Sequence, residues 1–387
     1  MTPAARAAAA IEILDRILAG APAEQTLTNW ARASRFAGSG DRHAIRDLVF
    51  DALRCRRSFA ALGGAGTGRG LILGGLRAAG ADPDAIFTGE GHAPTVLSEV
   101  EHAPPAAPGG LVALDCPDWL APRLEQSLGA DFAAVMQALR HRAPVFLRVN
   151  RLRATRDQAI AALADEGIAA GPHPLAETAL EVTGNARKIQ SSQAYATGLV
   201  ELQDAASQAV VEALPLADGQ RVLDYCAGGG GKTLAMAGRA RLRLWAHDVD
   251  PRRLRDLPDR ASRAGTKVAL LDSKAVDREA PFDLVLTDVP CSGSGSWRRA
   301  PEAKWTFTEA RLAQLLEIQA DILDRAAGLV GVGGSLAYAT CSLLYDENAG
   351  QVERFLQRHP DWHRVAERRL TPLDGGDGFY LSVMKRR

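Results

Sequence analysis

The chain has 387 residues, of which 47% are hydrophobic and 24% charged, an ordinary globular balance that allows two or three domains. Lysine plus arginine equals aspartate plus glutamate at 46 each, so net charge alone does not indicate a nucleic-acid partner. The five cysteines are odd in number and form no C-x-x-C pair, which disfavours a disulfide framework and a structural zinc site. We therefore expect reduced thiols and no bound metal.

The first hundred residues are typical of helices. Ile45, Leu48, Val49 and Leu53 share one helix face, and no strand pattern interrupts this part of the chain. The alanine-rich N-terminus lacks the apolar core of a signal peptide or a membrane helix, which predicts a soluble cytoplasmic protein. A Pro/Gly linker at 102–110 marks the end of a first domain over 1–115. On pattern alone this domain is a helical bundle of unknown use.

Residues 116–200 change character from a helical connector to a small α+β unit. We expect strands at 145–150 and 179–182, with a helix between them that Thr155 caps. Basic residues gather on this stretch and again further on: Arg140, Arg142, Arg148, Arg151, Arg153 and Arg156, then Arg252, Arg253, Arg255, Arg260 and Arg263. Such clusters fit either a phosphate-binding face or an ordinary solvated surface. The α+β unit itself could bind RNA or could simply connect two domains.

From residue 201 to 387 strands alternate with helices, which predicts a doubly wound parallel sheet in an α/β domain. The expected strands are 221–225, 242–247, 268–271, 282–288 and 335–340, and the sequence over 378–384 suggests a C-terminal pair.

The first of these strands ends in a glycine-rich turn. Gly228 to Gly231 are consecutive glycines, so backbone N–H groups can close upon a ligand there. A Walker A loop would need glycine where Cys226 stands, and G-x-G-x-x-G is poorly met because Lys232 and Thr233 follow the run directly. The remaining candidate ligand for this turn is a nucleoside that carries no pyrophosphate, such as S-adenosylmethionine.

Carboxylates end the next three strands. Asp248 is placed to accept from ribose hydroxyls, Asp272 to meet an adenine edge, and Asp288 to lie near the reacting centre. One aspartate at a strand end is more often a helix cap than a ligand, but aspartates at the ends of the second, third and fourth strands together favour a binding site.

Two cysteines leave the carboxyl ends of the fourth and fifth strands. Cys291 follows Asp288-Val289-Pro290, and Cys341 lies in Thr340-Cys341-Ser342. These strands are neighbours in a doubly wound sheet, so both thiols should face the same crevice. A single cysteine is usually buried and inert, but this pairing favours a nucleophile.

These motifs resemble the RsmB/Sun (NOP/Nsun-type) family of S-adenosylmethionine-dependent RNA cytosine-5 methyltransferases. The resemblance is specific from Val200 onward and loose before Pro117. It rests on 224–233, 288–295, 298–305, 319–323, 340–348 and 377–380, with weaker similarity at 147–151 and 203–208. It implies a Rossmann-like class I methyltransferase domain over 201–387, an RRM-like α+β unit that binds RNA, and an N-terminal NusB-like domain.

The resemblance also implies a mechanism and its residues. Cys341 would attack C6 of a cytosine, Cys291 would assist loss of the C5 proton and release of the RNA, and Asp288 would bind the base edge or the cofactor. The expected cofactor-binding residues are Cys226, Ala227, Gly228, Gly229, Gly230, Gly231, Lys232, Asp248, Arg253, Asp272 and Asp288. The expected substrate is an unpaired or flipped cytosine of small-subunit (16S) ribosomal RNA. The protein should act as a monomer, without DNA or a membrane.

Two departures and two alternatives accompany this interpretation. Gly228 and Gly229 replace the family's Ala-Pro, which should make the turn more flexible, and Val289 replaces alanine. A DNA cytosine-5 methyltransferase would use the Pro-Cys thiol and would not need Cys341. A catalytically inactive RNA-binding assembly factor would not need the combination of Cys291, Cys341, Asp288 and Lys232.

Overall fold

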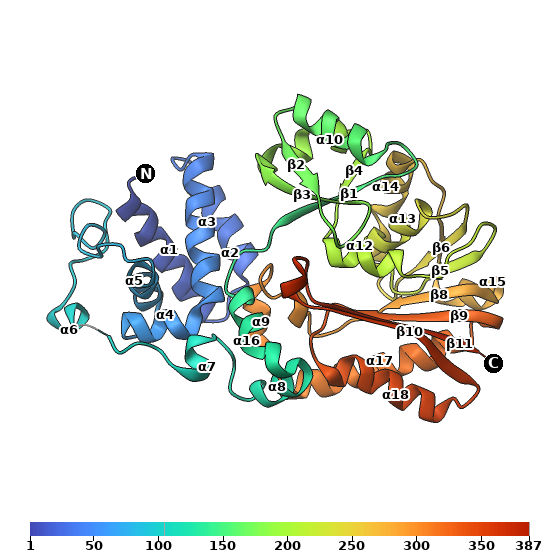
Figure 1. The fold of residues 1–387 in the computed structure, drawn as a ribbon. Helices are drawn as coiled ribbons and strands as arrows, with labels where there is room; N and C mark the ends of the chain where they lie inside the picture. The colour runs from blue at the N-terminus through green and yellow to red at the C-terminus, as the bar shows by residue number, and fades with distance from the viewer. Residues whose placement is uncertain (104, 387) are drawn as a thin grey trace. The chain divides into compact units, whose positions relative to one another are not determined.

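The computed structural model describes residues 1–103 and 105–386 and divides the chain into two compact units (Figure 1). The first holds Met1–Arg142 together with Trp297–Thr306, and the second holds Ala143–Ser296 and the chain from Phe307 onward. Among the described residues no helix is both long and apolar enough to cross a membrane.

The described part of the first unit is helical, as the periodicity predicts. Its core contains Ile13, Leu14, Ile45, Leu53 and Leu71, all at most 2% exposed. Its helices are α1 (Pro3–Leu18), α2 (Ala23–Ala33), α3 (Ser39–Arg54), α4 (Arg56–Gly63), α5 (Gly68–Ala78), α6 (Glu99–His102), α7 (Gly110–Ala113), α8 (Ala121–Leu128), α9 (Phe132–Leu139) and α16 (Pro301–Thr306). Helices α8 and α9 correspond to the expected connector, and they pack in this unit, so the structure divides the chain after Arg142 and not at 115.

A segment from the C-terminal half of the sequence belongs to this helical unit, which the sequence does not predict. Arg54 Nε donates to the carbonyl of Arg298 at 2.8 Å, and Lys304 Nζ donates to the carbonyl of Arg54 at 3.1 Å. Burial lowers the pKa of Lys304 to about 8. The stretch 297–306 therefore leaves the α/β domain between two of its elements, and the expected domain 201–387 is not continuous in sequence.

The second unit begins with a four-stranded antiparallel sheet of order β2-β3-β1-β4. Its elements are β1 (Val145–Val149), α10 (Arg156–Asp165), β2 (Ala169–Pro172), β3 (Ala179–Gly184), α11 (Gln193–Ala196) and β4 (Val200–Leu202). This is the ferredoxin-like arrangement expected of an RRM-like unit, and Thr155 caps α10 as predicted. Strands β2 and β4 were not predicted, because β2 reads Ala-Ala-Gly-Pro and β4 has three residues.

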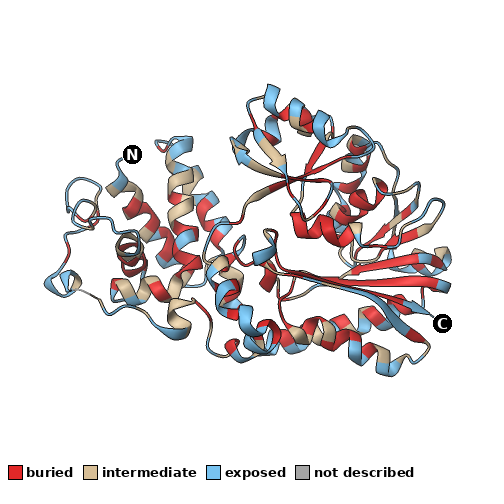
Figure 2. Cartoon of the chain, viewed as in Figure 1, coloured by how far each residue is buried: buried red, intermediate tan, exposed pale blue. Residues whose placement is uncertain are grey.

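The α/β domain is a seven-stranded sheet of order β10-β11-β9-β8-β5-β6-β7, in which β11 is antiparallel to β9. Its strands are β5 (Arg221–Asp224), β6 (Arg243–His247), β7 (Ala269–Leu271), β8 (Phe282–Asp288), β9 (Val330–Thr340), β10 (Trp362–Leu370) and β11 (Phe379–Arg386). The five predicted parallel strands are confirmed. The expected C-terminal pair is formed by β10 and β11. The sequence did not locate β10 because it is an edge strand, mostly exposed, with no apolar alternation (Figure 2).

Alternation along the strands builds a core on each face of this sheet. Leu284 and Leu286 lie in one cluster with helices α12 and α13, whereas Val285 lies in the other with α17 and α18. Figure 1 shows α12, α13 and α14 on one side of the sheet and α17 and α18 on the other. The covering helices are α12 (Ala205–Glu212), α13 (Gly231–Ala237), α14 (Leu257–Ala264), α15 (Ser273–Glu279), α17 (Glu309–Ala327) and α18 (Ala349–Arg358).

Candidate active site

The predicted site residues meet at the carboxyl edge of the seven-stranded sheet. Asp224 ends β5 and Asp288 ends β8, and these strands are paired in parallel. Asp288 lies opposite Ala339 of β9, one residue before that strand ends at Thr340. The glycine turn, the strand-end carboxylates and both thiols therefore leave neighbouring strands at one edge, as parallel topology requires.

The turn after β5 needs glycine at specific positions. Gly228 and Gly230 have φ of +53° and +79°, a region that side chains rarely adopt. A Cβ at Gly230 would lie 2.2 Å from Leu257 Cδ1 of α14. The main chain of the turn is therefore held against α14, and Gly231 opens helix α13 directly behind it.

Asp248 and Arg253, on the chain that follows β6, support this turn. Asp248 is buried, and its Oδ2 accepts from Gly228 N at 2.9 Å and from Arg253 Nη1 at 3.0 Å. Asp272 lies after β7, where it caps helix α15: its Oδ1 accepts from two main-chain N–H groups at 2.9 and 2.7 Å. The common structural role of a strand-end aspartate is thus present at Asp272.

Two arginines donate hydrogen bonds to carbonyls of the glycine turn. The sequence did not indicate these contacts. Arg260 Nη1 donates to the carbonyl of Gly229, and Arg148 Nη1 donates to the carbonyl of Gly231 at 2.8 Å. Burial lowers the pKa of Arg148 to about 10, so this arginine belongs neither to a solvated surface nor to a phosphate-binding face. Arginines compensate here for the flexibility expected from Gly228 and Gly229.

The arginine cluster around β1 is therefore divided by the fold. Arg140 and Arg142 belong to the helical unit, whereas Arg151, Arg153 and Arg156 are exposed in the second unit.

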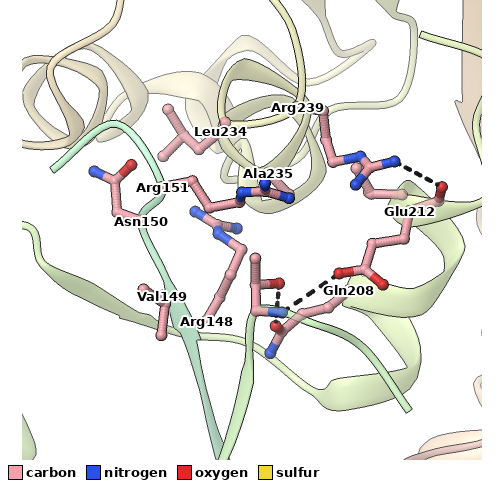
Figure 3. Close-up of a pocket in the computed structure, with 12 residues that line it drawn as sticks. Arg148, Val149, Asn150, Arg151, Gln208, Glu212, Leu234, Ala235 and Arg239 are labelled. Carbon is pink, nitrogen blue, oxygen red and sulfur yellow. Dashed lines mark hydrogen bonds between the residues drawn. The ribbon is translucent and has the colours of Figure 1, made fainter. Parts of the chain in front are cut away.

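The ferredoxin-like unit, β1 to β4, packs against α12 and α13 beside the glycine turn (Figure 3). Thr178 Oγ1 donates to Gln208 Oε1 at 2.8 Å, and Arg239 Nη2 of the α13–β6 loop donates to the carbonyl of Glu212 at 3.2 Å. The cavity that these residues line measures about 10 Å³, which admits about one water molecule. It is a packing seam and not a ligand site.

Lys232 and Asp288 form an ion pair beside the glycine turn. The Nζ–Oδ2 distance is 2.7 Å, and Nζ also lies 4.7 Å from the centre of the Phe379 ring. Burial alone would lower the pKa of Lys232, but the charge of Asp288 and its hydrogen bond outweigh burial and raise it. Lys232 is therefore a fixed cation at neutral pH, with Asp288 oriented by it.

The two thiols predicted to face one crevice are in contact. Cys291 Sγ and Cys341 Sγ are 3.4 Å apart, and both residues are only partly buried. The hydrogen bond with Cys341, together with burial and the charges of Cys341 and Glu347, raises the pKa of Cys291 well above its usual value. Cys291 is consequently a protonated thiol beside its partner.

Asp224 is a buried carboxyl group of this site that the sequence did not single out. Its Oδ2 accepts from Thr233 Oγ1 at 2.6 Å, and its Oδ1 is buried with no hydrogen-bond partner among the described residues. Burial raises its pKa to about 7. An acidic residue at the end of β5, before Cys226, was the only signal for it.

The Asp224 carboxyl should make folding stability depend on pH. The unfolded chain restores its pKa to about 4, so between about pH 4 and 7 only the folded state keeps the proton, and stability declines as pH rises. In the parent protein the free energy of unfolding should fall by on the order of 3 kcal/mol over this pH range because of Asp224, and in Asp224→Asn this fall should be absent. Urea unfolding of both proteins from pH 4.5 to 8 tests this, and curves that stay parallel would contradict it.

Among the described residues no group of three or more His, Cys, Asp or Glu side chains is arranged to hold a metal ion.

The parallel sheet with antiparallel β11, and the glycine turn at the end of β5, define a Rossmann-like methyltransferase domain. Residues 211–382 match the family model of the 16S rRNA methyltransferase RsmB/F, and residues 116–189 match the ferredoxin-like domain of RsmF/B-like methyltransferases. The chain belongs to the RsmB/F family of methyltransferases, whose methyl donor is S-adenosylmethionine. The second match includes α8 and α9, which the contacts place in the helical unit.

Relatives and solved structures agree with this family. Ribosomal RNA small subunit methyltransferase B of Klebsiella pneumoniae subsp. pneumoniae is 35% identical over 291 residues, which cover 70% of this chain and 66% of that protein. The chain thus spans just under two thirds of that curated relative. The crystal structure of PH0851 shares the fold over 100% of this chain and 99% of its own, with a TM-score of 0.79 at 23% identity. A methyltransferase homolog protein from Pyrococcus horikoshii covers 72% of this chain and 97% of its own, with a TM-score of 0.63 at 26% identity.

Proposed function

We propose that the protein methylates C5 of a cytosine in RNA and that Cys341 is the covalent nucleophile. The observation that carries this proposal is the contact between the Cys291 and Cys341 thiols at the ends of neighbouring parallel strands. A DNA cytosine-5 methyltransferase would need only the Pro-Cys thiol, whereas here both thiols face the same edge. The inactive assembly factor has no use for a partly buried Lys232–Asp288 ion pair beside two thiols.

The residues at the sheet edge fit S-adenosylmethionine. The turn from Cys226 to Gly229 reaches the protein surface, buried Asp248 lies behind it, and the unpartnered Oδ1 of Asp224 can accept a hydrogen bond from the cofactor. We assign cofactor binding to the predicted set: Cys226, Ala227, Gly228, Gly229, Gly230, Gly231, Lys232, Asp248, Arg253, Asp272 and Asp288. The cofactor supplies an electrophilic methyl group on a sulfonium.

The reaction begins at the base. C5 of cytosine is a weak nucleophile, and addition of the Cys341 thiolate to C6 makes the ring enamine-like, so that C5 can take the methyl group. The C5 proton is then removed and the Cys341–C6 bond breaks, which restores both the ring and the thiolate. Asp288, oriented by its ion pair with Lys232, would hydrogen-bond the base edge or the cofactor.

Cys291 changes its proton affinity when the adduct forms. In the free enzyme its hydrogen bond with Cys341 is the largest cause of its raised pKa. Once Cys341 is bonded to C6, the Cys341 thiolate charge is gone, so the pKa of Cys291 falls. Cys291 then releases its own proton to solvent, and the resulting thiolate takes the C5 proton at the stage where a base is needed.

The substrate we propose is small-subunit ribosomal RNA, because the relatives are named ribosomal RNA small subunit methyltransferase B. The target cytosine must be unpaired or flipped, since C6 is inaccessible in a stacked helix. The helical and ferredoxin-like parts would bind the RNA around it, and we propose that the protein acts as a monomer.

Incubation with methyl-labelled S-adenosylmethionine tests this function. Unmethylated small-subunit rRNA and duplex DNA are offered separately, and we expect label in the RNA only, recovered as 5-methylcytidine. Label in DNA alone would support the DNA enzyme, and no label in either would support the inactive assembly factor.

Arg148 should matter for cofactor binding although it lies in the ferredoxin-like unit. Arg148→Met would leave the buried carbonyls of Gly231 and Gln203 Oε1 without their donor, at a cost of about 1–3 kcal/mol. We expect the Kd for S-adenosylmethionine, measured by calorimetry, to rise by about tenfold. Arg151→Met, at an exposed position on the same unit, is the matched control and should bind normally. Unchanged affinity in Arg148→Met would separate this arginine from the cofactor site.

A further inference from the structure

Glu347 is a fully buried carboxylate that the mechanism above does not use. It lies on the turn Tyr345–Glu347, six residues after Cys341, and has 0% exposure. Its Oε1 accepts from Ser292 N at 2.8 Å and from Gln319 Nε2 at 3.0 Å. Its Oε2 accepts from Ser292 Oγ and from Ser342 Oγ, each at 2.5 Å. A single carboxylate thus binds α17 through Gln319 and two further chain segments, one at Ser292 and one at Ser342.

These two segments are the ones that carry the thiols. Ser292 follows Cys291 directly, and Ser342 follows Cys341 directly. The two serine hydroxyls lie 3.2 Å apart. The carboxylate and the serines therefore form a bridge between the chain that leaves β8 and the chain that leaves β9, immediately behind the reactive pair.

The bridge is itself held in place. Tyr338 OH donates to the carbonyl of Glu347 at 2.6 Å, and Asn348 Nδ2 donates to the carbonyl of Ser342 at 2.8 Å. Thr340 Oγ1 donates to Asn348 Oδ1 at 2.5 Å. Because these hydrogen bonds hold the main chain at Glu347, its carboxylate can fix the positions of Ser292 and Ser342 and of the thiols next to them.

Stability alone does not account for this arrangement. In the part of the chain that the structure describes, four groups donate to the carboxylate and all are neutral, so burial of its charge is offset there by hydrogen bonds and not by a cation. Replacing a buried charged network with apolar side chains of similar volume is often neutral or stabilising. A buried carboxylate that bridges two reactive segments is better explained by a functional requirement.

We propose that Glu347 is a positioning residue that sets the separation and orientation of the Cys291 and Cys341 thiols. This proposal rests on the proposed function and adds to it the group that aligns the nucleophile with its proton acceptor. The charge of Glu347 also acts on Cys291: after the hydrogen bond with Cys341, burial and the Cys341 charge, it contributes to the raised pKa of that thiol.

The test uses thiol chemistry, so that it does not depend on methyl transfer. Oxidised glutathione converts the Cys291 and Cys341 thiols to a disulfide, and the two thiol hydrogens end on the two molecules of reduced glutathione that form. We expect the parent protein to form the Cys291–Cys341 disulfide readily, because its sulfurs are already in contact. Both oxygens of the Glu347 carboxylate accept hydrogen bonds. In Glu347→Gln an amide NH₂ replaces one of these oxygens and faces another donor, which breaks the bridge and displaces the thiols. The rate of disulfide formation should therefore fall at least about tenfold.

Rates measured from pH 7 to 9 separate geometry from charge. A slower rate at every pH is expected from misplaced thiols, whereas a rate that recovers the parent value at one end of the range would overturn the positioning role. In activity assays kcat should fall at least about tenfold while the Kd for S-adenosylmethionine stays within about twofold. Glu353→Gln, a change at an exposed glutamate that accepts from Tyr345 OH, is the control and should match the parent in every assay.

A second variant covers the case in which Glu347→Gln does not fold. Ser342→Ala keeps the carboxylate but removes one of the two serine hydroxyls that donate to it. Its rate of disulfide formation should therefore lie between those of the parent and Glu347→Gln, and a rate equal to that of the parent would contradict the proposal. If the parent protein fails to methylate RNA, the proposed function is wrong, and the disulfide rates still decide whether Glu347 positions the thiols.

Discussion

Replacing Cys291 with alanine should turn the protein into a covalent trap for its RNA. Cys341 can still add to C6 and C5 can still be methylated, but the C5 proton then has no nearby base. Loss of a general base slows proton transfer by about 10²–10⁴-fold, so the Cys341–C6 bond outlives the assay. On a denaturing gel with labelled rRNA and S-adenosylmethionine, we expect a slowly migrating protein–RNA band that protease removes.

Two controls define this result. Cys291→Ala combined with Cys341→Ala should give no such band, because the nucleophile is absent. Cys55→Ala, at a buried cysteine of the helical unit, should release RNA normally. If Cys291→Ala yields only free protein and normal turnover, Cys291 has no role in release.

Replacing Cys341 with alanine should abolish turnover. Without covalent addition at C6, C5 is too weak a nucleophile, and we expect kcat to fall by about 10³-fold or more. Cofactor binding should be unchanged, because the turn from Cys226 to Gly231 and its supports do not include Cys341. Single-turnover methyl transfer and calorimetry of S-adenosylmethionine binding measure the two quantities separately. Residual activity near that of the parent would remove Cys341 from the mechanism.

The sequence predicted the parts of the site that depend on local pattern and sheet topology. Strand β8 is a mostly apolar segment that ends in Asp288, and its observed bounds match the prediction. The pairing of Cys291 with Cys341 followed from neighbouring parallel strands. Asp248 and the glycine turn were recognised in the same way, because each is attached to the end of a strand.

The remaining site features depend on tertiary contacts that no local pattern contains. Arg148 lies in strand β1, and nothing in the sequence of that strand indicates a contact with the glycine turn. Only the folded chain brings its guanidinium to the carbonyl of Gly231. Glu347 lies in the polar run Asp346-Glu347-Asn348, which resembles an exposed turn until Ser292 and Ser342 are placed around it. The docking of 297–306 in the helical unit likewise depends on contacts distant in sequence.

Release of the C5 hydrogen tests the central claim most directly. Small-subunit rRNA labelled with tritium at C5 of cytosine is incubated with S-adenosylmethionine whose methyl carries carbon-14. We predict that tritium appears in water in a one-to-one ratio with carbon-14 incorporated into RNA, and that Cys341→Ala abolishes both. Methyl transfer without tritium release would place the methyl group elsewhere on the RNA and would contradict the account.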